Sequence, residues 1–181
     1  MPDLQRQIAD TIVLVRSELE AQCRRRGVPP PVLRPHPPAD EGLIAELERH
    51  HQIRLPPSYR AFLSLHDGYD GLAYYGDLLS VRSALPGGSQ YQEIVTWKKR
   101  CADYGSGEVL DGVVIGSSLQ SNQWLFIDIN RPAPRGEYIF VDWIGESSEE
   151  FASLIDYFDF VVTTCRIDLA DSDNLRLAPA S

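Results

Sequence analysis

The fold is decided by the stretch LPPSYRAFL at residues 55–63, which the tripeptide HDG closes at residues 66–68. Proline suits the first turn of a helix, because the N–H that it lacks has no partner there in any case. Tyr59, Phe62 and Leu63 then follow at helical spacing and form one apolar face. The glycine of HDG supplies the left-handed residue that ends such a helix. The stretch therefore predicts a short helix that buries one side against another element.

Two further helices are predicted upstream of this stretch. Asp40 is a good N-cap for a helix that runs to about Gln52. Residues 3–24 repeat apolar side chains every three or four positions, which predicts an amphipathic N-terminal helix. Residues 28–39, between the two helices, contain six prolines, a density that excludes a helix or a central strand. We expect this segment to be an extended, semi-rigid linker.

Downstream of the stretch, the pattern changes from helices to strands. A helix is predicted at 91–101, and strands are predicted at 113–115, 122–129 and 137–143, the last two as an antiparallel hairpin.

The hairpin register and the closing helix follow from the same pattern. Pairing Ile129 with Glu137 places Trp124 opposite Asp142 and leaves apolar residues on both faces of the sheet. We therefore expect the sheet to be covered on one side and partly covered on the other. Residues 147–150 have the Ser-x-x-Glu spacing of a capping box, which predicts that the closing helix begins there.

Helices, then strands, then a closing helix is the order of an α+β fold. We expect a mostly antiparallel sheet packed against helices, in a single domain with an N-terminal helical arm. The predicted divisions are an arm at 1–27, a proline-rich linker at 28–39, the α+β domain at 40–165 and an acidic, flexible tail at 166–181.

Composition is that of a globular chain: 181 residues, 43% hydrophobic and 24% charged, with a formal net charge of −9. An acidic balance argues against nucleic acid or an anionic membrane as a direct partner, because both need a basic face. The charge is uneven, +2 over residues 1–35 and −11 over the remainder. It serves either solubility or the attraction of a basic protein partner, and charge alone leaves both open.

The sequence lacks cysteine motifs, a signal peptide and a membrane-spanning run, and this predicts the cellular compartment. Cys23, Cys101 and Cys165 are far apart and form no Cys-x-x-Cys motif, so neither a zinc ribbon nor a thioredoxin-like site is indicated. The N-terminus has no signal-peptide pattern, and no apolar run approaches the ~20 residues that span a bilayer. We expect a cytoplasmic protein that does not insert into membranes and is monomeric when free.

Motifs for catalysis or cofactor binding are incomplete. Residues 116–118, GSS, lack the second glycine of a nucleophile elbow. Residues 105–107, GSG, lack the third glycine of a dinucleotide loop, and there is no Walker lysine. His50 and His51 are adjacent, whereas a zinc pair on a helix needs i, i+4 spacing; we expect one surface and one core histidine, both with satisfied rings. No enzyme activity, metal or cofactor is therefore expected.

The stretch at 55–68 resembles the signature segment of the SUKH superfamily. This superfamily includes the fungal Smi/Knr cell-wall assembly regulators, the Syd protein and many bacterial immunity proteins. Similar pieces follow in family order: the strand at 114–116, the apolar strand WLFID at 124–128 and the closing helix at 151–158. The likeness covers roughly residues 40–160, and Asp67 stands where the family more often has asparagine.

The resemblance implies an α+β domain that binds another protein and has no enzyme activity. In bacteria, such proteins typically neutralise a toxin delivered by a neighbouring cell, by binding the toxin domain and blocking its active site. The resemblance implies that this chain is an immunity protein for a cognate toxin. The acidic charge of the chain favours a basic toxin, for example a nuclease. The alternative is a regulatory scaffold of the Smi/Knr type, in which the arm and linker recruit partners.

Two groups of residues are candidates for contact with such a partner, because tyrosine and tryptophan supply contact area and carboxylates complement a basic surface. The first, which we call the loop patch, follows the signature helix and comprises Asp67, Tyr69, Asp70, Tyr74, Tyr75 and Asp77. The second, which we call the tryptophan patch, comprises Asp142, Trp143, Glu146, Glu149 and Glu150. Some of the loop rings are equally expected to pack beneath the loop.

Overall fold

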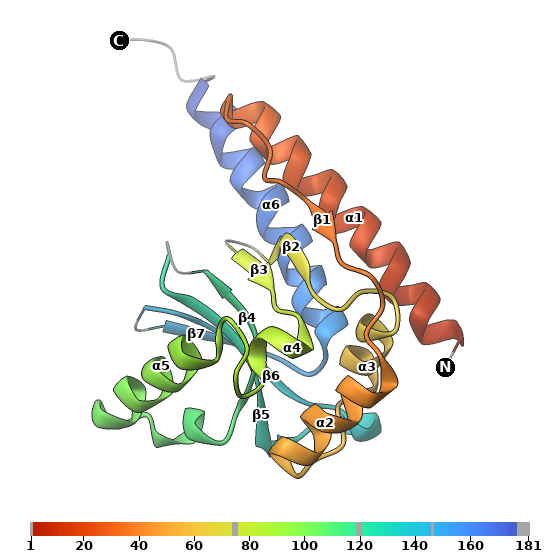
Figure 1. Ribbon diagram of the computed structural model, residues 1–181. Helices are drawn as coiled ribbons and strands as arrows, with labels where there is room; N and C mark the ends of the chain where they lie inside the picture. Colours follow the sequence, from red (N-terminus) through yellow and green to blue (C-terminus); the bar gives the residue numbers. More distant parts are fainter. Residues whose placement is uncertain (1, 74–75, 119–120, 146, 177–181) are drawn as a thin grey trace.

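The computed structural model describes residues 2–73, 76–118, 121–145 and 147–176, which fold into helices around one sheet (Figure 1). The helices are α1 (Pro2–Arg26), α2 (Glu41–His51), α3 (Pro57–Leu63), α4 (Val81–Ala84), α5 (Tyr91–Asp103) and α6 (Leu154–Arg176), with 3₁₀ helices η1 (Gly107–Leu110) and η2 (Pro134–Gly136). The strands are β1 (Arg34–Pro35), β2 (Tyr69–Ala73), β3 (Gly76–Leu78), β4 (Val113–Ser118), β5 (Gln123–Pro132), β6 (Tyr138–Ile144) and β7 (Ser147–Phe151). The predicted α+β class is confirmed.

The sheet is an antiparallel meander. Its strands lie in the order β1-β2-β3-β4-β5-β6-β7, so each strand pairs with its neighbours in sequence. Short reversals join β2 to β3, β4 to β5, β5 to β6 and β6 to β7, whereas α2 and α3 lie between β1 and β2, and α4, α5 and η1 lie between β3 and β4.

The predicted register of the β5–β6 hairpin was wrong by one residue. Asp128 pairs with Ile139, and Trp124 pairs with Trp143 and not with Asp142. The register shifts between Asp128 and Pro132, so the chain reversal holds a bulge that a uniform count does not anticipate. A slip of one residue reverses the face of every side chain, and this reversal decides where Asp142 points.

The predicted start of the closing helix was also wrong. Residues 147–151 form the edge strand β7, which pairs with β6 through Trp143 and Ser148. Helix α6 begins after Ser153, whose hydroxyl accepts the Asp156 backbone N–H at 3.2 Å and donates to the Asp156 carboxylate at 2.8 Å. The reciprocal cap therefore exists, but it lies six residues beyond the predicted one.

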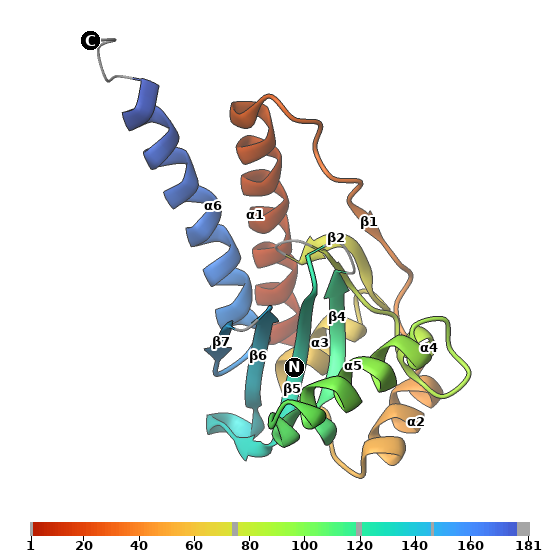
Figure 2. The same ribbon diagram turned by 90° about the vertical axis from the view of Figure 1, so that its left-hand side faces the viewer.

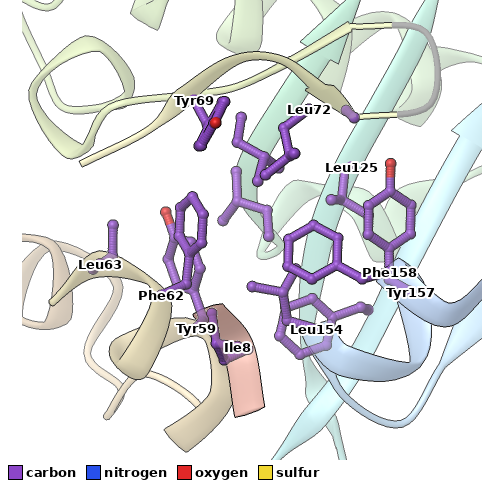
Figure 3. Close-up of a cluster of buried hydrophobic side chains, with 14 of the residues drawn as sticks. Ile8, Tyr59, Phe62, Leu63, Tyr69, Leu72, Leu125, Leu154, Tyr157 and Phe158 are labelled. Atoms are coloured by element: carbon purple, nitrogen blue, oxygen red, sulfur yellow. The ribbon is translucent and has the colours of Figure 1, made fainter. Parts of the chain in front are cut away.

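Two hydrophobic layers cover the two faces of the sheet. On one face, helices α1, α3 and α6 enclose the larger core, in which the rings of Phe62 and Phe158 lie 6.3 Å apart (Figure 3). On the other face, helix α5 covers a smaller core, in which Trp97 stacks on Trp124 with ring centroids 4.8 Å apart. A sheet covered on one side and partly covered on the other was predicted, and the structure has this arrangement.

Helix α1 packs along α6 for much of its length (Figures 1 and 2). Its apolar stripe is buried in the larger core and consists of Ile8, Ile12, Val15 and Leu19. Glu18 also binds the Arg166 guanidinium, with contacts of 2.8 and 2.9 Å. Helix α6 continues to Arg176, into the stretch that the sequence predicted to be a tail.

The proline-rich segment is bonded to the signature region along its second half. Arg34 and Pro35 form β1 and pair with β2. The Asp67 backbone N–H donates to the Pro37 carbonyl at 2.7 Å, and the His36 Nε2 lies 2.8 Å from the Asp70 carboxylate. The segment therefore follows a defined path from α1 to α2.

Candidate partner-binding surface

Three chain reversals lie at one end of the sheet, those between β2 and β3, between β4 and β5, and between β6 and β7. Alternate reversals of an antiparallel meander share an end, and the pairing confirms it here. Asp77 pairs with Ser117, Ser118 pairs with Gln123, and Gln123 pairs with Ile144. We call this region the reversal end. Of the described patch residues, Asp77 lies beside the first reversal and Trp143 beside the last, whereas Asp67 and Tyr69 lie at the opposite end of β2, so parts of both patches share one end of the sheet.

The aspartates of the loop patch hold the β2–β3 hairpin in shape. Asp67 accepts the Val81 backbone N–H at 2.6 Å, and Asp77 accepts the Gly71 backbone N–H at 2.7 Å. Asp70 bonds the linker imidazole, as described above. Asp77 remains exposed and Asp70 half-buried, so both carboxylates also reach the surface.

The tyrosines of the loop patch do not share one environment. Tyr69 is 1% exposed, and its ring meets the edge of His66 with centroids 5.3 Å apart. It packs beneath the hairpin, where a partner does not reach it. Tyr74 and Tyr75 lie outside the described residues.

The tryptophan patch contains one half-buried indole beside exposed carboxylates. The Trp143 Nε1 donates to the Gly145 carbonyl at 2.7 Å, which fixes the ring on the β6–β7 reversal. Glu149 and Glu150 are exposed on edge strand β7, and Glu150 is bound to Arg131 at 2.9 Å. Glu146 lies outside the described residues.

Asp142 lies in the core beneath the patch, at 1% exposure. The corrected register places it opposite Leu125, on the face of the sheet that α1, α3 and α6 cover. Both of its carboxylate oxygens accept from the Gln123 Nε2, at 2.7 and 2.8 Å. Burial raises the pKa of Asp142 to about 6, although the bonds from Gln123 oppose this rise and the nearby Glu149 adds to it. A partner does not contact this side chain directly.

A hollow of about 900 Å³ lies beside the first two reversals. It is bounded by the C-terminal part of α1, by the linker and by the strand ends, through residues that include Cys23, Val32, Asp77 and Ser118. The arm and linker therefore share a surface with the loop patch. The arm and linker residues of this hollow were not predicted, because the arm was expected to be separate, although the apolar stripe of residues 3–24 already required a covering partner.

The family comparison matches residues 38–159 to the model of the SMI1/KNR4 family (SUKH-1). The chain belongs to this family. The match spans both patches and begins after helix α1 and most of the linker, so it corresponds to the region whose residues resemble the family in sequence. No curated protein matches the chain. SUKH-1 membership supports a role in binding another protein, either in toxin immunity or in regulation of the Smi/Knr kind.

Within the residues that the structure describes, no three His, Cys, Asp or Glu side chains come together in a way that could hold a metal ion. None of the described helices combines the length and the apolar character that crossing a bilayer requires.

Proposed function

We propose that this SUKH-1 chain is an immunity protein that binds a basic toxin domain and blocks its active site. Family membership supports a protein partner, and the formal net charge of −9 favours a basic one. The binding surface in this proposal is the reversal end of the sheet.

One observation carries the choice of surface: the half-buried Trp143 pairs with β7, whose exposed Glu150 lies on the same face of the sheet and whose exposed Glu149 lies on the other face at the sheet edge. An aromatic anchor with a charged rim is the usual composition of an interface hot spot, because the ring loses water completely while the charges stay at the edge. The exposed Asp77 adds a further carboxylate at the same end of the sheet.

Co-expression with the toxin encoded beside this chain tests the function. We expect the wild-type chain to protect the cell and to co-purify with the toxin. Continued killing without a complex would overturn the proposal.

Paired variants test the surface separately from the function. Trp143→Ala and Glu149→Lys are expected to weaken protection, because the first removes the anchor and the second reverses a rim charge. Glu46→Lys is the matched control, since Glu46 is an exposed carboxylate on α2, outside the reversal end. If all three variants protect as well as wild type, the toxin binds elsewhere on the molecule.

A regulatory scaffold remains the second candidate, favoured by exposed apolar residues on the arm and linker. Val13 and Val32 are 66% and 71% exposed. Deleting residues 1–39 does not distinguish the candidates, because it also removes the buried stripe of α1 from the core. Val13→Asp and Val32→Asp keep the core intact: recruitment of a scaffold partner is expected to fail in these variants, whereas toxin binding at the reversal end survives.

A further inference from the structure

A second hollow, of about 430 Å³, lies between the C-terminal end of α2 and helix α5. Its apolar wall includes Ile94, Val114 and Ile129. Its polar lining is unusual for an acidic protein, because it gathers basic and hydroxyl groups: His50, His51, Tyr91, Lys98 and Lys99. We call this region the α2–α5 hollow. It is separate from the reversal end, and none of its lining residues belongs to either patch.

The two lysines of the chain both line the α2–α5 hollow, while the chain also has fifteen arginines, none of which lines it. The Lys98 Nζ donates to the Leu110 carbonyl at 2.9 Å and to the Gly112 carbonyl. An ammonium group has three protons, so one remains for a ligand. The two hydrogen bonds to backbone carbonyls hold the Lys98 ammonium group in place beside the hollow.

The histidines contribute further donors. The rings of His50 and His51 meet edge to face with centroids 4.8 Å apart, and the His50 ring also faces Tyr91 at 6.3 Å. His50 is exposed and His51 is half-buried, so the expected surface ring is present and the expected core ring is only partly covered. Among the described residues, no hydrogen bond is formed by either imidazole, so their nitrogens are open to a ligand.

The charges around the hollow are not balanced. Asp111 is its single lining carboxylate and is exposed, whereas Lys98, Lys99 and the two imidazoles also line the hollow. Burial lowers the pKa of Lys98 to about 8, with Asp111 opposing the change. Burial lowers the pKa of His51 to about 4, and the charges of Lys98 and His50 add to the effect. An added negative charge would stabilise the protonated form of both groups.

We propose that the α2–α5 hollow binds a small organic anion, whose carboxylate or phosphate group contacts Lys98 and the paired imidazoles and whose apolar stem lies on Ile94, Val114 and Ile129. An apolar pocket with a few convergent polar groups is the usual composition of a small-molecule site. The free proton on Lys98 supplies the charge-assisted hydrogen bond that distinguishes an anion from a neutral analogue. This site is independent of the proposed immunity function.

Phenyl phosphate and benzoate are suitable probes, with phenol as the uncharged control. Calorimetry at pH 7 measures their affinity for the full chain. Acylation by an amine-reactive ester, read by peptide mass spectrometry, reports on the site directly, because Lys98 and Lys99 are the only lysines. We expect saturable binding of both anions, protection of Lys98 from acylation, and no protection by phenol.

Matched variants on one helix complete the test. Lys98→Gln is expected to weaken phenyl phosphate binding by about ten-fold or more, as loss of a charge-assisted hydrogen bond predicts. Arg100→Gln removes a positive charge from the same helix outside the hollow and is expected to change affinity less than about two-fold. A Lys98→Gln variant that remains folded by circular dichroism and binds like wild type would overturn the proposal. So would the absence of saturable binding, or equal protection by phenol.

Discussion

Glu137 caps helix α3 from 79 residues away by binding Ser58 twice. Its Oε1 accepts the Ser58 backbone N–H and its Oε2 accepts the Ser58 hydroxyl, each at 2.8 Å. The same hydroxyl oxygen accepts the backbone N–H of Leu154, the first residue of α6, at 3.1 Å. One serine of the signature stretch therefore joins the starts of two helices to the β5–β6 hairpin. Burial raises the pKa of Glu137, although the bonds from Ser58 oppose the rise.

Ser58→Ala is expected to destabilise the fold. The substitution leaves the buried Glu137 carboxylate and the Leu154 N–H each short of a partner, at a cost of about 1–3 kcal/mol. Urea unfolding followed by circular dichroism measures the free energy. Ser17→Ala, at an exposed position on α1, is the control, and equal midpoints for the two variants would contradict the prediction.

Asp142→Asn is expected to stabilise the protein at neutral pH. The pKa of Asp142 rises from 3.8 in the unfolded chain to about 6 in the fold, so the native state holds this proton more tightly. The raised pKa of Asp142 therefore stabilises the fold fully below pH 4, and this stabilisation is lost as the pH rises through 6.

Asparagine has no charge to bury at neutral pH. The free energy of unfolding of the variant should therefore exceed that of wild type by about 1–3 kcal/mol at pH 7, on the scale of 1.36 kcal/mol per pKa unit. The gain should shrink toward pH 4. Asparagine can also donate to the Gln123 Oε1, which is buried and finds no donor among the described residues. Unfolding free energies at pH 4.5 and 7 measure the effect, and a variant that is less stable at both would sink the prediction.

Helix α1 offers a matched pair of valines. Val15 is fully buried and Val13 is 66% exposed, on the same helix and two positions apart. Val15→Ala should cost about 1–3 kcal/mol, because it removes two buried methyl groups and leaves a cavity. Val13→Ala should be nearly neutral. Equal unfolding midpoints for both variants would mean that α1 does not contribute to the core in solution.

His51 should stay neutral to about pH 4, because burial and the charge of Lys98 lower its pKa. A lowered histidine pKa contributes stability above pH 6.5 that is lost as the pH falls through 4. Lys98→Met removes one of these causes, so the His51 resonance should titrate at higher pH in that variant than in wild type. Arg100→Met is the control that keeps Lys98. Nuclear magnetic resonance of the imidazole follows the titration, and an unchanged His51 curve in Lys98→Met would contradict the assigned cause.

Association with the proposed toxin should slow as salt rises, because an acidic surface steers a basic partner electrostatically. Glu149→Gln should lower the association rate at low salt and have less effect at high salt. Glu46→Gln should leave both rates unchanged. Stopped-flow mixing measures the rates, and a salt-independent association would rule out steering by this surface.

Local patterns were read correctly from the sequence where a few neighbouring residues determine them. Asp40 caps α2 by accepting the Gly42 N–H, and Tyr59, Phe62 and Leu63 are buried on one face of α3, as predicted. Predictions failed where pairing between distant residues mattered: a bulge moved the hairpin register by one, and pairing with β6 made residues 147–151 a strand, so that Ser153 and not Ser147 caps α6.

The candidate site was predicted as two patches of residue types, and the structure sorted their members. Asp77, Trp143, Glu149 and Glu150 reach the surface, while Tyr69 is buried. Composition alone does not separate these cases, because an aromatic ring near the surface and one beneath a hairpin have the same sequence neighbourhood. The α2–α5 hollow likewise depends on α2 and α5 facing each other, which no short pattern encodes.

The sequence by itself determined the family, the α+β order of elements, the apolar faces of its helices and the acidic charge, since each depends on residue type and short-range spacing. Only the tertiary structure decided that Glu137 caps α3, that the register places Asp142 in the core, and that Asp77 and Trp143 lie at one end of the sheet. These relationships join residues tens of positions apart through pairing and packing. A single bulge can shift such pairing without leaving a clear mark in local sequence.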